Sequence, residues 1–181
     1  MKILVAYASK HGSTRGIAER IAERLSTCGL EADAVPVKAA RDVTTYDAFV
    51  VGSALYMFRW MGEARAFVHR NRKALAGKPI WLFSSGPFGP ETTNKDGRNL
   101  LEVSGPKEID ELRAMLQPRD HRVFFGAWEA GAEPVGLSER LMMLMPAVRK
   151  AFPVGDYRDW PAIEAWADAI AGELDAKSAA R

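Results

Sequence analysis

Four continuous apolar segments constrain the fold of this chain more than any other feature of its sequence. They comprise residues 3–7, 48–52, 80–84 and 122–127. Segments that are apolar at successive positions, without alternation, are typical of parallel strands covered by helices on both faces. A weaker run at residues 32–37 contains Pro36, which cannot donate a ladder hydrogen bond. This weaker strand is therefore expected at an edge of the sheet.

Helical patterns fill the intervals between these segments. They lie at residues 14–27, 63–75, 106–116 and 161–174. Strands that alternate with helices predict an α/β fold with right-handed crossovers. We expect a three-layer sandwich around a five-stranded parallel sheet of order 2-1-3-4-5. In such sheets a ligand binds at the carboxyl edge, where the strand order reverses.

Length and composition limit the architecture and the class of protein. With 181 residues, 48% of them hydrophobic, the chain supports one core, so residues 1–175 are predicted to form a single domain and residues 176–181 a disordered tail. No stretch approaches the ~20 apolar residues of a membrane span, and no signal peptide precedes the first strand. These features predict a cytoplasmic protein. A net charge of +2 and the lack of a recognised module give no indication of nucleic-acid binding.

The loop between the first strand and the first helix is the clearest candidate binding element. Its residues are Ser9, Lys10, His11, Gly12, Ser13 and Thr14. The first N–H groups of a helix have no partner within the helix, and that end of the helix dipole is positive. Gly12 permits a close approach of the backbone, and the hydroxyls can donate to phosphate oxygens. The loop is therefore interpreted as a phosphate site, with a simple helix cap at Ser13 as the alternative.

Two further loops follow the third and fourth strands and add aromatic side chains. Their candidate ligand-binding residues are Ser53, Ala54, Leu55, Tyr56 and Met57, and Ser85, Gly86, Pro87, Phe88 and Gly89. Tyr56, Phe58, Trp60 and Phe88 could stack on a flat ring, although Trp60 could instead pack inward. A phosphate site at one end and a ring sandwich at the other predict flavin mononucleotide (FMN) as cofactor. A deazaflavin analogue remains the alternative.

The residues that carry these features resemble a known family. Residues 3–14, residues 48–56 and the pair Asp159–Trp160 are similar to segments of the flavodoxin-fold proteins, and more specifically of the bacterial menaquinone-dependent protoporphyrinogen oxidases. The resemblance implies FMN held by the three loops, with a quinone as electron acceptor. It also implies that an insertion after the fifth strand, residues 137–152, faces a membrane or a partner.

The sequence leaves several functional alternatives open. An FMN-dependent oxidoreductase acting on a small organic substrate is the first hypothesis, with no side chain assigned a catalytic role because the flavin carries the chemistry. A flavodoxin-type electron carrier and a flavin-free assembly module are the alternatives. The Met-rich residues 137–152 are interpreted as a core or homodimer contact, or as a contact with the inner face of the membrane. Three scattered histidines and the single Cys28 predict no metal site.

Overall fold

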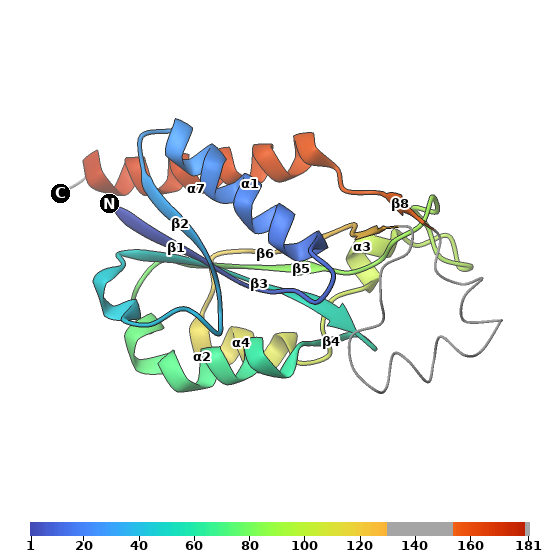
Figure 1. The fold of residues 1–181 in the computed structure, drawn as a ribbon, viewed down its shortest axis with the longest axis horizontal. Helices are drawn as coiled ribbons and strands as arrows, with labels where there is room; N and C mark the ends of the chain where they lie inside the picture. The colour runs from blue at the N-terminus through green and yellow to red at the C-terminus, as the bar shows by residue number, and fades with distance from the viewer. Residues whose placement is uncertain (130–153, 180–181) are drawn as a thin grey trace.

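A parallel sheet forms the centre of the computed structural model, which describes residues 1–129 and 154–179 (Figure 1). The five parallel strands are β1 (Lys2–Ala8), β2 (Glu31–Pro36), β3 (Ala48–Tyr56), β5 (Ile80–Ser85) and β6 (His121–Phe124). Their order is β2-β1-β3-β5-β6, and the short β4 (Arg59–Trp60) pairs antiparallel with β3. The predicted order of the parallel strands is confirmed, with the Pro36 strand at an edge.

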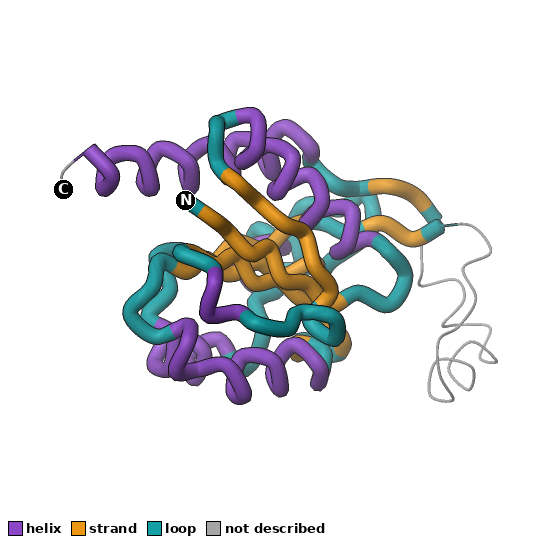
Figure 2. The backbone as a smooth tube through the Cα atoms, turned by 60° about the vertical axis from the view of Figure 1, so that its left-hand side comes forward, coloured by secondary structure: helices purple, strands orange, loops and turns teal. Residues whose placement is uncertain are grey.

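Helices cover both faces of this sheet. On one face lie α1 (Ser13–Thr27) and α7 (Trp160–Ala179), and on the other lie α2 (Gly62–Leu75) and α4 (Ile109–Leu116), as Figures 1 and 2 show. Two shorter elements are η1 (Val43–Thr45) and α3 (Leu100–Val103). The arrangement confirms the predicted three-layer sandwich.

Burial explains why the strands are apolar at successive positions. In β1, Ile3 and Val5 belong to the core beneath α1 and α7, whereas Leu4 and Ala6 belong to the core beneath α2 and α4. Alternate side chains of a strand point to opposite faces, and here both faces are covered. Each central strand therefore contributes to two cores, and together they fix the positions of the loops at the carboxyl edge.

Two predicted strand ends differ from the structure. The third strand continues beyond Gly52 to Tyr56, because β4 turns back and pairs with it, so Ser53 to Tyr56 lie in a strand rather than a loop. The fifth parallel strand ends at Phe124 instead of residue 127. The chain then forms β7 (Ala127–Trp128), which pairs antiparallel with β8 (Gly155–Asp156) in a separate two-stranded ribbon.

Two helix boundaries also differ from the prediction. α4 begins at Ile109 rather than residue 106, because Ile109 N–H bonds the Pro106 carbonyl in a turn before the helix. α7 continues to Ala179, and the domain boundary at residue 175 stays a prediction. Residues 137–152 lie outside the described residues. Across the ranges that the structure describes, none of the helices combines the length and hydropathy required to span a bilayer.

Candidate functional site

The loop between β1 and α1 places the amino end of a helix at the carboxyl edge of the sheet. Gly12 is the N-cap of α1, with a φ of 85°, and no side chain in the described part of the chain caps the helix there. Ser9 Oγ accepts the Gly12 N–H at 3.1 Å and so stabilises the curled loop. The first N–H groups of α1 point out of the helix end, where the helix dipole is positive. This geometry fits the predicted phosphate site.

Two observations test whether a phosphate group fits this loop. Thr14 is 1% exposed, and its Oγ1 has no hydrogen-bond partner among the described residues. A buried hydroxyl without a partner is costly, and a ligand oxygen would satisfy it. A Cβ at Gly12 would meet no atom within 4 Å, so the space beside this glycine is open to a ligand. The loop residues therefore fit the phosphate of FMN.

Ser13 has a different role from the helix cap considered as an alternative. Its Oγ accepts the backbone N–H of Ala127 at 2.8 Å and lies 3.5 Å from Ser85 Oγ. Gly126 N–H bonds the Pro87 carbonyl, and Tyr157 N–H bonds the Gly126 carbonyl. Ser13 thus links the first loop to the end of β5 and to the β7–β8 ribbon.

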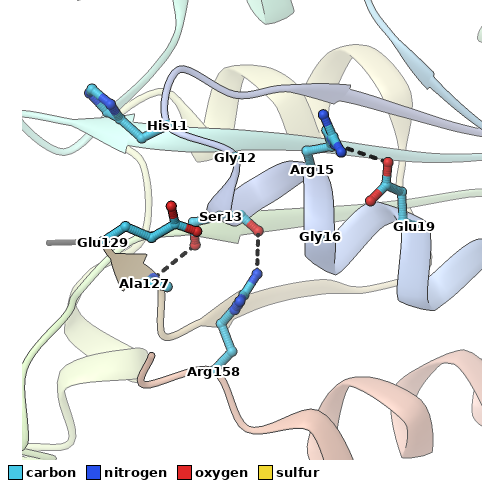
Figure 3. Close-up of a pocket in the computed structure, with 9 residues that line it drawn as sticks. All are labelled: His11, Gly12, Ser13, Arg15, Gly16, Glu19, Ala127, Glu129 and Arg158. Atoms are coloured by element: carbon cyan, nitrogen blue, oxygen red, sulfur yellow. Dashed lines mark hydrogen bonds and ion pairs between the residues drawn. The ribbon is translucent and has the colours of Figure 1, made fainter. Parts of the chain in front are cut away.

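A cavity of about 320 Å³ flanks the amino end of α1 (Figure 3). Its lining residues are His11, Gly12, Ser13, Arg15, Gly16, Glu19, Ala127, Glu129 and Arg158. Arg158 Nη1 lies 3.4 Å from the Ser13 carbonyl, and its guanidinium is bonded to Asp156 and stacked 4.4 Å from the Trp160 ring. Arg15 pairs with Glu19 at 3.0 Å. Because carboxylates balance both arginines, this cavity alone does not select an anion.

The second predicted loop meets the first one across the sheet edge. Ala8 in β1 is in register with Ser53 in β3, and Lys10 Nζ lies 4.4 Å from the centre of the Tyr56 ring. Ala54 is in register with Ser85, and a Cβ at Gly86 would lie 2.8 Å from Leu55 Cδ1. Residues of the first, second and third loops are therefore neighbours, as the sequence predicted.

Trp128 joins the first and third loops and was missed by sequence reasoning. Its ring lies 4.7 Å from the His11 ring and 6.0 Å from the Phe88 ring, with Phe88 nearly parallel to it. The residue directly follows the apolar segment 122–127, so its position beyond a carboxyl strand end was the available signal. Together Tyr56, Phe88 and Trp128 supply the aromatic surfaces suited to a flat ring.

One of the aromatic residues considered for the ring, Trp60, lies elsewhere, and a contact of Phe58 with the ring stays a prediction. Trp60 is 2% exposed and donates through Nε1 to Ser84 Oγ at 2.8 Å, so it packs inward, as the alternative interpretation allowed. Phe58 is 54% exposed and Met57 81% exposed at the turn between β3 and β4. The role of Met57 as a cofactor ligand, like that of the other predicted loop residues, stays a prediction.

A polar cluster lies beneath the carboxyl edge. Ser84 Oγ shares a 2.9 Å hydrogen bond with His121 Nε2, and Ser53 Oγ accepts the Met61 N–H at 3.0 Å. Burial, aided by the nearby Arg113 charge, lowers the pKa of His121 from 6.5 to about 4 despite the opposing Asp120. At neutral pH this histidine is uncharged, and the cluster joins β5, β6 and β4 through hydrogen bonds.

The site contains cofactor-binding features rather than a metal centre. Within residues 1–129 and 154–179, no group of histidine, cysteine, aspartate or glutamate side chains could hold a metal ion. The open space at Gly12, the buried Thr14 hydroxyl and the aromatic rings that contact Lys10 and His11 of the first loop instead suit an organic phosphate with a flat ring.

Solved structures share this fold. A flavodoxin from the domain Archaea aligns with 97% of this chain and 99% of its own, at a TM-score of 0.59 and 16% identity. Rubredoxin:oxygen oxidoreductase from the anaerobe Desulfovibrio gigas aligns with 98% of this chain but only 37% of its own, at a TM-score of 0.60 and 16% identity. The two-electron reduced flavodoxin of Megasphaera elsdenii aligns with 67% of this chain and 84% of its own, at a TM-score of 0.52 and 16% identity. At these identities the likeness shows the fold.

Sequence comparison identifies the family. A comparison with curated protein sequences finds no match. A family model described as a flavodoxin domain matches residues 4–149, which is more than half of the chain. Membership of this family implies FMN as the cofactor, in agreement with the prediction from the three loops. The chain belongs to the flavodoxin domain family Flavodoxin_5.

Proposed function

We propose that this protein is an FMN-dependent oxidoreductase that moves electrons from a reduced organic donor to a quinone-like acceptor. The observation that carries the proposal is the meeting of the three loops, marked by the Lys10–Tyr56 and His11–Trp128–Phe88 contacts. Protoporphyrinogen is the proposed donor on the family resemblance alone. Bound FMN supplies a ring that accepts and releases electrons.

The residues of this chain bind and orient the cofactor in the proposed mechanism. The amides of the first turn of α1 and the Thr14 hydroxyl hold the phosphate, which fixes the position of the tail. Tyr56 on one side and the Phe88–Trp128 pair on the other hold the ring and exclude water from it.

Lys10 places a positive charge beside the proposed ring position. Its Nζ lies over the Tyr56 ring, and the side chain is half-buried. A fixed cation stabilises negative charge that develops nearby, and this effect is stronger where water is excluded. We propose that Lys10 makes reduction of the cofactor more favourable, so that the site suits a two-electron exchange with an organic substrate.

A flavodoxin-type electron carrier is the second candidate function. The archaeal flavodoxin aligns over nearly the whole of both chains, which favours this alternative. A carrier has no substrate of its own and passes electrons to protein partners. The two candidates differ in how the loaded protein is reduced: a carrier takes electrons in two separate steps, whereas we expect this protein to be reduced in a single two-electron step.

The remaining parts of the proposal concern partners and location. We propose a cytoplasmic protein in which residues 137–152 contact either the inner face of the membrane or a second copy of the chain. The resemblance to the quinone-dependent oxidases supports the membrane contact, and the Met-rich composition supports either one.

An absorption spectrum and a stepwise reduction test the proposed function. The protein purified with FMN is expected to be yellow, to be reduced in one step, and to transfer electrons from protoporphyrinogen or another organic donor to a soluble quinone. Gly12→Val provides the matched control, because it blocks the phosphate loop and is expected to remove both colour and activity. Reduction in two resolved steps without donor turnover would favour the carrier instead.

A further inference from the structure

The turn between β3 and β4 presents two large apolar side chains to solvent. Met57 is 81% exposed and Phe58 54% exposed, and they are adjacent at the tip of the hairpin. Isolated exposed apolar residues are common on protein surfaces, but two neighbouring ones at a projecting tip are a candidate contact surface. We call Met57 and Phe58 the hairpin tip.

The backbone of the hairpin tip is unusual for these residue types. Met57 has a φ of 53° and Phe58 a φ of 59°, and the strand pairs Leu55–Trp60 and Tyr56–Arg59 enclose them as a two-residue loop. Hairpins of this kind favour asparagine and glycine, because a left-handed backbone brings the Cβ of other residues into steric conflict with the main chain. The chain therefore carries strain to keep two bulky side chains at the tip, a pattern associated with functional sites.

The hairpin is anchored firmly behind its tip. Trp60 is buried, its backbone N–H donates to Glu108 Oε1 at 2.7 Å, and its ring donates to Ser84. The Phe58 carbonyl accepts the Lys107 N–H at 2.9 Å. Because these contacts fix the base of the hairpin, Met57 and Phe58 project from a rigid support.

Cationic side chains lie beside the hairpin tip. Arg59 adjoins it and is exposed, Lys107 is exposed beside the Phe58 carbonyl, and Lys10 lies over the neighbouring Tyr56 ring. The acidic residue at the base, Glu108, is buried, and Arg59 and Arg65 each lie 3.9 Å from its carboxylate. Two exposed cationic side chains, Arg59 and Lys107, therefore lie beside the apolar tip, and Arg59 is close to the Glu108 carboxylate.

We propose that the hairpin tip inserts into an anionic lipid surface, with Arg59 and Lys107 contacting the headgroups. A convex apolar tip needs no matching pocket in a bilayer, whereas a protein partner would need a concave complement over a larger area. Arginine and lysine near an anionic membrane add about 1 kcal/mol each, or roughly fivefold in affinity. The carboxyl edge with Tyr56 would then face the membrane. Because Met57 belongs to the predicted ring loop, the proposal is tested first on the apoprotein, whose vesicle binding does not depend on the proposed function.

Vesicle sedimentation tests the proposal. The full chain, with and without FMN, is mixed with vesicles of phosphatidylcholine alone or with 30% phosphatidylglycerol, at low and at physiological salt. We expect binding to the anionic vesicles that weakens as salt rises. Phe58→Gly is expected to lower the affinity at least tenfold, while its melting temperature stays equal or rises because glycine relieves the positive φ. That stability readout separates lost docking from lost folding.

Two further variants define the surface. Val103→Ser removes a different apolar side chain, 37% exposed on α3, and is expected to bind vesicles like the wild type. Arg59→Gln and Lys107→Gln are each expected to lower anionic-vesicle affinity about fivefold. Equal vesicle binding by the wild type and Phe58→Gly would overturn the proposal. Absence of vesicle binding would overturn it as well. A tip that cross-links to an acidic protein and binds no vesicles would show a protein partner in place of the membrane.

Discussion

Two of the turns that adopt left-handed backbone carry opposite kinds of residue at those positions. At the first loop the position is Gly12, with a φ of 85° and open space where a side chain would stand. At the β3–β4 turn the positions are Met57 and Phe58, whose side chains are large and exposed. Glycine adopts the left-handed backbone without strain and lets a ligand approach the backbone closely. Met57 and Phe58 keep backbone strain at the same kind of position, and their side chains expose apolar surface. We interpret the first turn as a binding turn for the cofactor phosphate and the second as a turn that holds two apolar side chains at the surface.

Among these variants, Gly12→Val is expected to have the largest effect, a loss of FMN affinity at the first turn. Valine at a φ of 85° is strained, and its side chain would occupy the open space beside the loop amides. FMN affinity should fall by at least a hundredfold, or roughly 3 kcal/mol. Fluorescence titration with FMN measures the loss, and circular dichroism checks that the variant is folded. Undiminished FMN affinity would place the phosphate away from this loop.

Acid should weaken the base of the β3–β4 hairpin more than the first loop. His121 bonds Ser84, which bonds Trp60, and burial lowers the pKa of His121 to about 4. The unfolded chain binds this proton near pH 6.5, so it holds more protons than the folded chain between those values. The free energy of unfolding should therefore fall by up to about 3 kcal/mol as the pH drops from 6.5 to 4.

The matched variant for this pH effect is His121→Asn, which retains a partner for Ser84 but does not titrate. Denaturant unfolding of both proteins at several pH values between 4 and 7 measures the difference. The variant should show a flatter dependence on pH in this window. A wild-type slope identical to that of the variant would contradict the assignment of the buried neutral histidine.

Thr14→Ala and Ser13→Ala should separate binding from support within the first loop. The Thr14 hydroxyl is buried without a partner among the described residues, so its removal should weaken FMN binding by about 1–3 kcal/mol without destabilising the FMN-free protein. Ser13→Ala should lower stability by about 0.5–1.5 kcal/mol, because Ala127 N–H loses its acceptor. Calorimetry of binding and of unfolding distinguishes them. Equal effects of both variants on FMN affinity would contradict a binding role for Thr14 that is separate from the supporting role of Ser13.

The smallest expected effect is at the second turn. Phe58→Gly should raise the free energy of unfolding by about 1 kcal/mol, because glycine adopts the positive φ without steric conflict. Gly12→Ala is the opposite control and should lower it by a similar amount. Urea unfolding of the FMN-free proteins measures both changes. A destabilised Phe58→Gly protein would show that the exposed side chain stabilises the fold, contrary to this account.

Much of the fold was predictable because burial on both faces of a sheet leaves a direct record in the sequence. The apolar segments located the parallel strands and their order, and the Pro36 strand was placed correctly at the edge. The extension of β3 to Tyr56 was not predictable from residues 53–56, because it depends on pairing with β4. The ribbon of Ala127–Trp128 with Gly155–Asp156 depends likewise on a contact distant in sequence.

The outline of the candidate site was predictable because the strands that carry its loops were predictable. Strand ends in parallel sheets converge, so the sequence could bring the first, second and third loops together before their contacts were known. It could not place Trp128 against His11 and Phe88, because that depends on where β6 ends. Nor could it show that Ser13 supports the ribbon while Thr14 carries the hydroxyl without a partner.

A crystal structure of the complex with FMN would test the central claim most directly. The account predicts the phosphate at the amino end of α1, within hydrogen-bond distance of Thr14 Oγ1 and the loop amides, and the ring between Tyr56 and Trp128. A complex in which the ligand lies elsewhere and the loop at Gly12 stays vacant would contradict it.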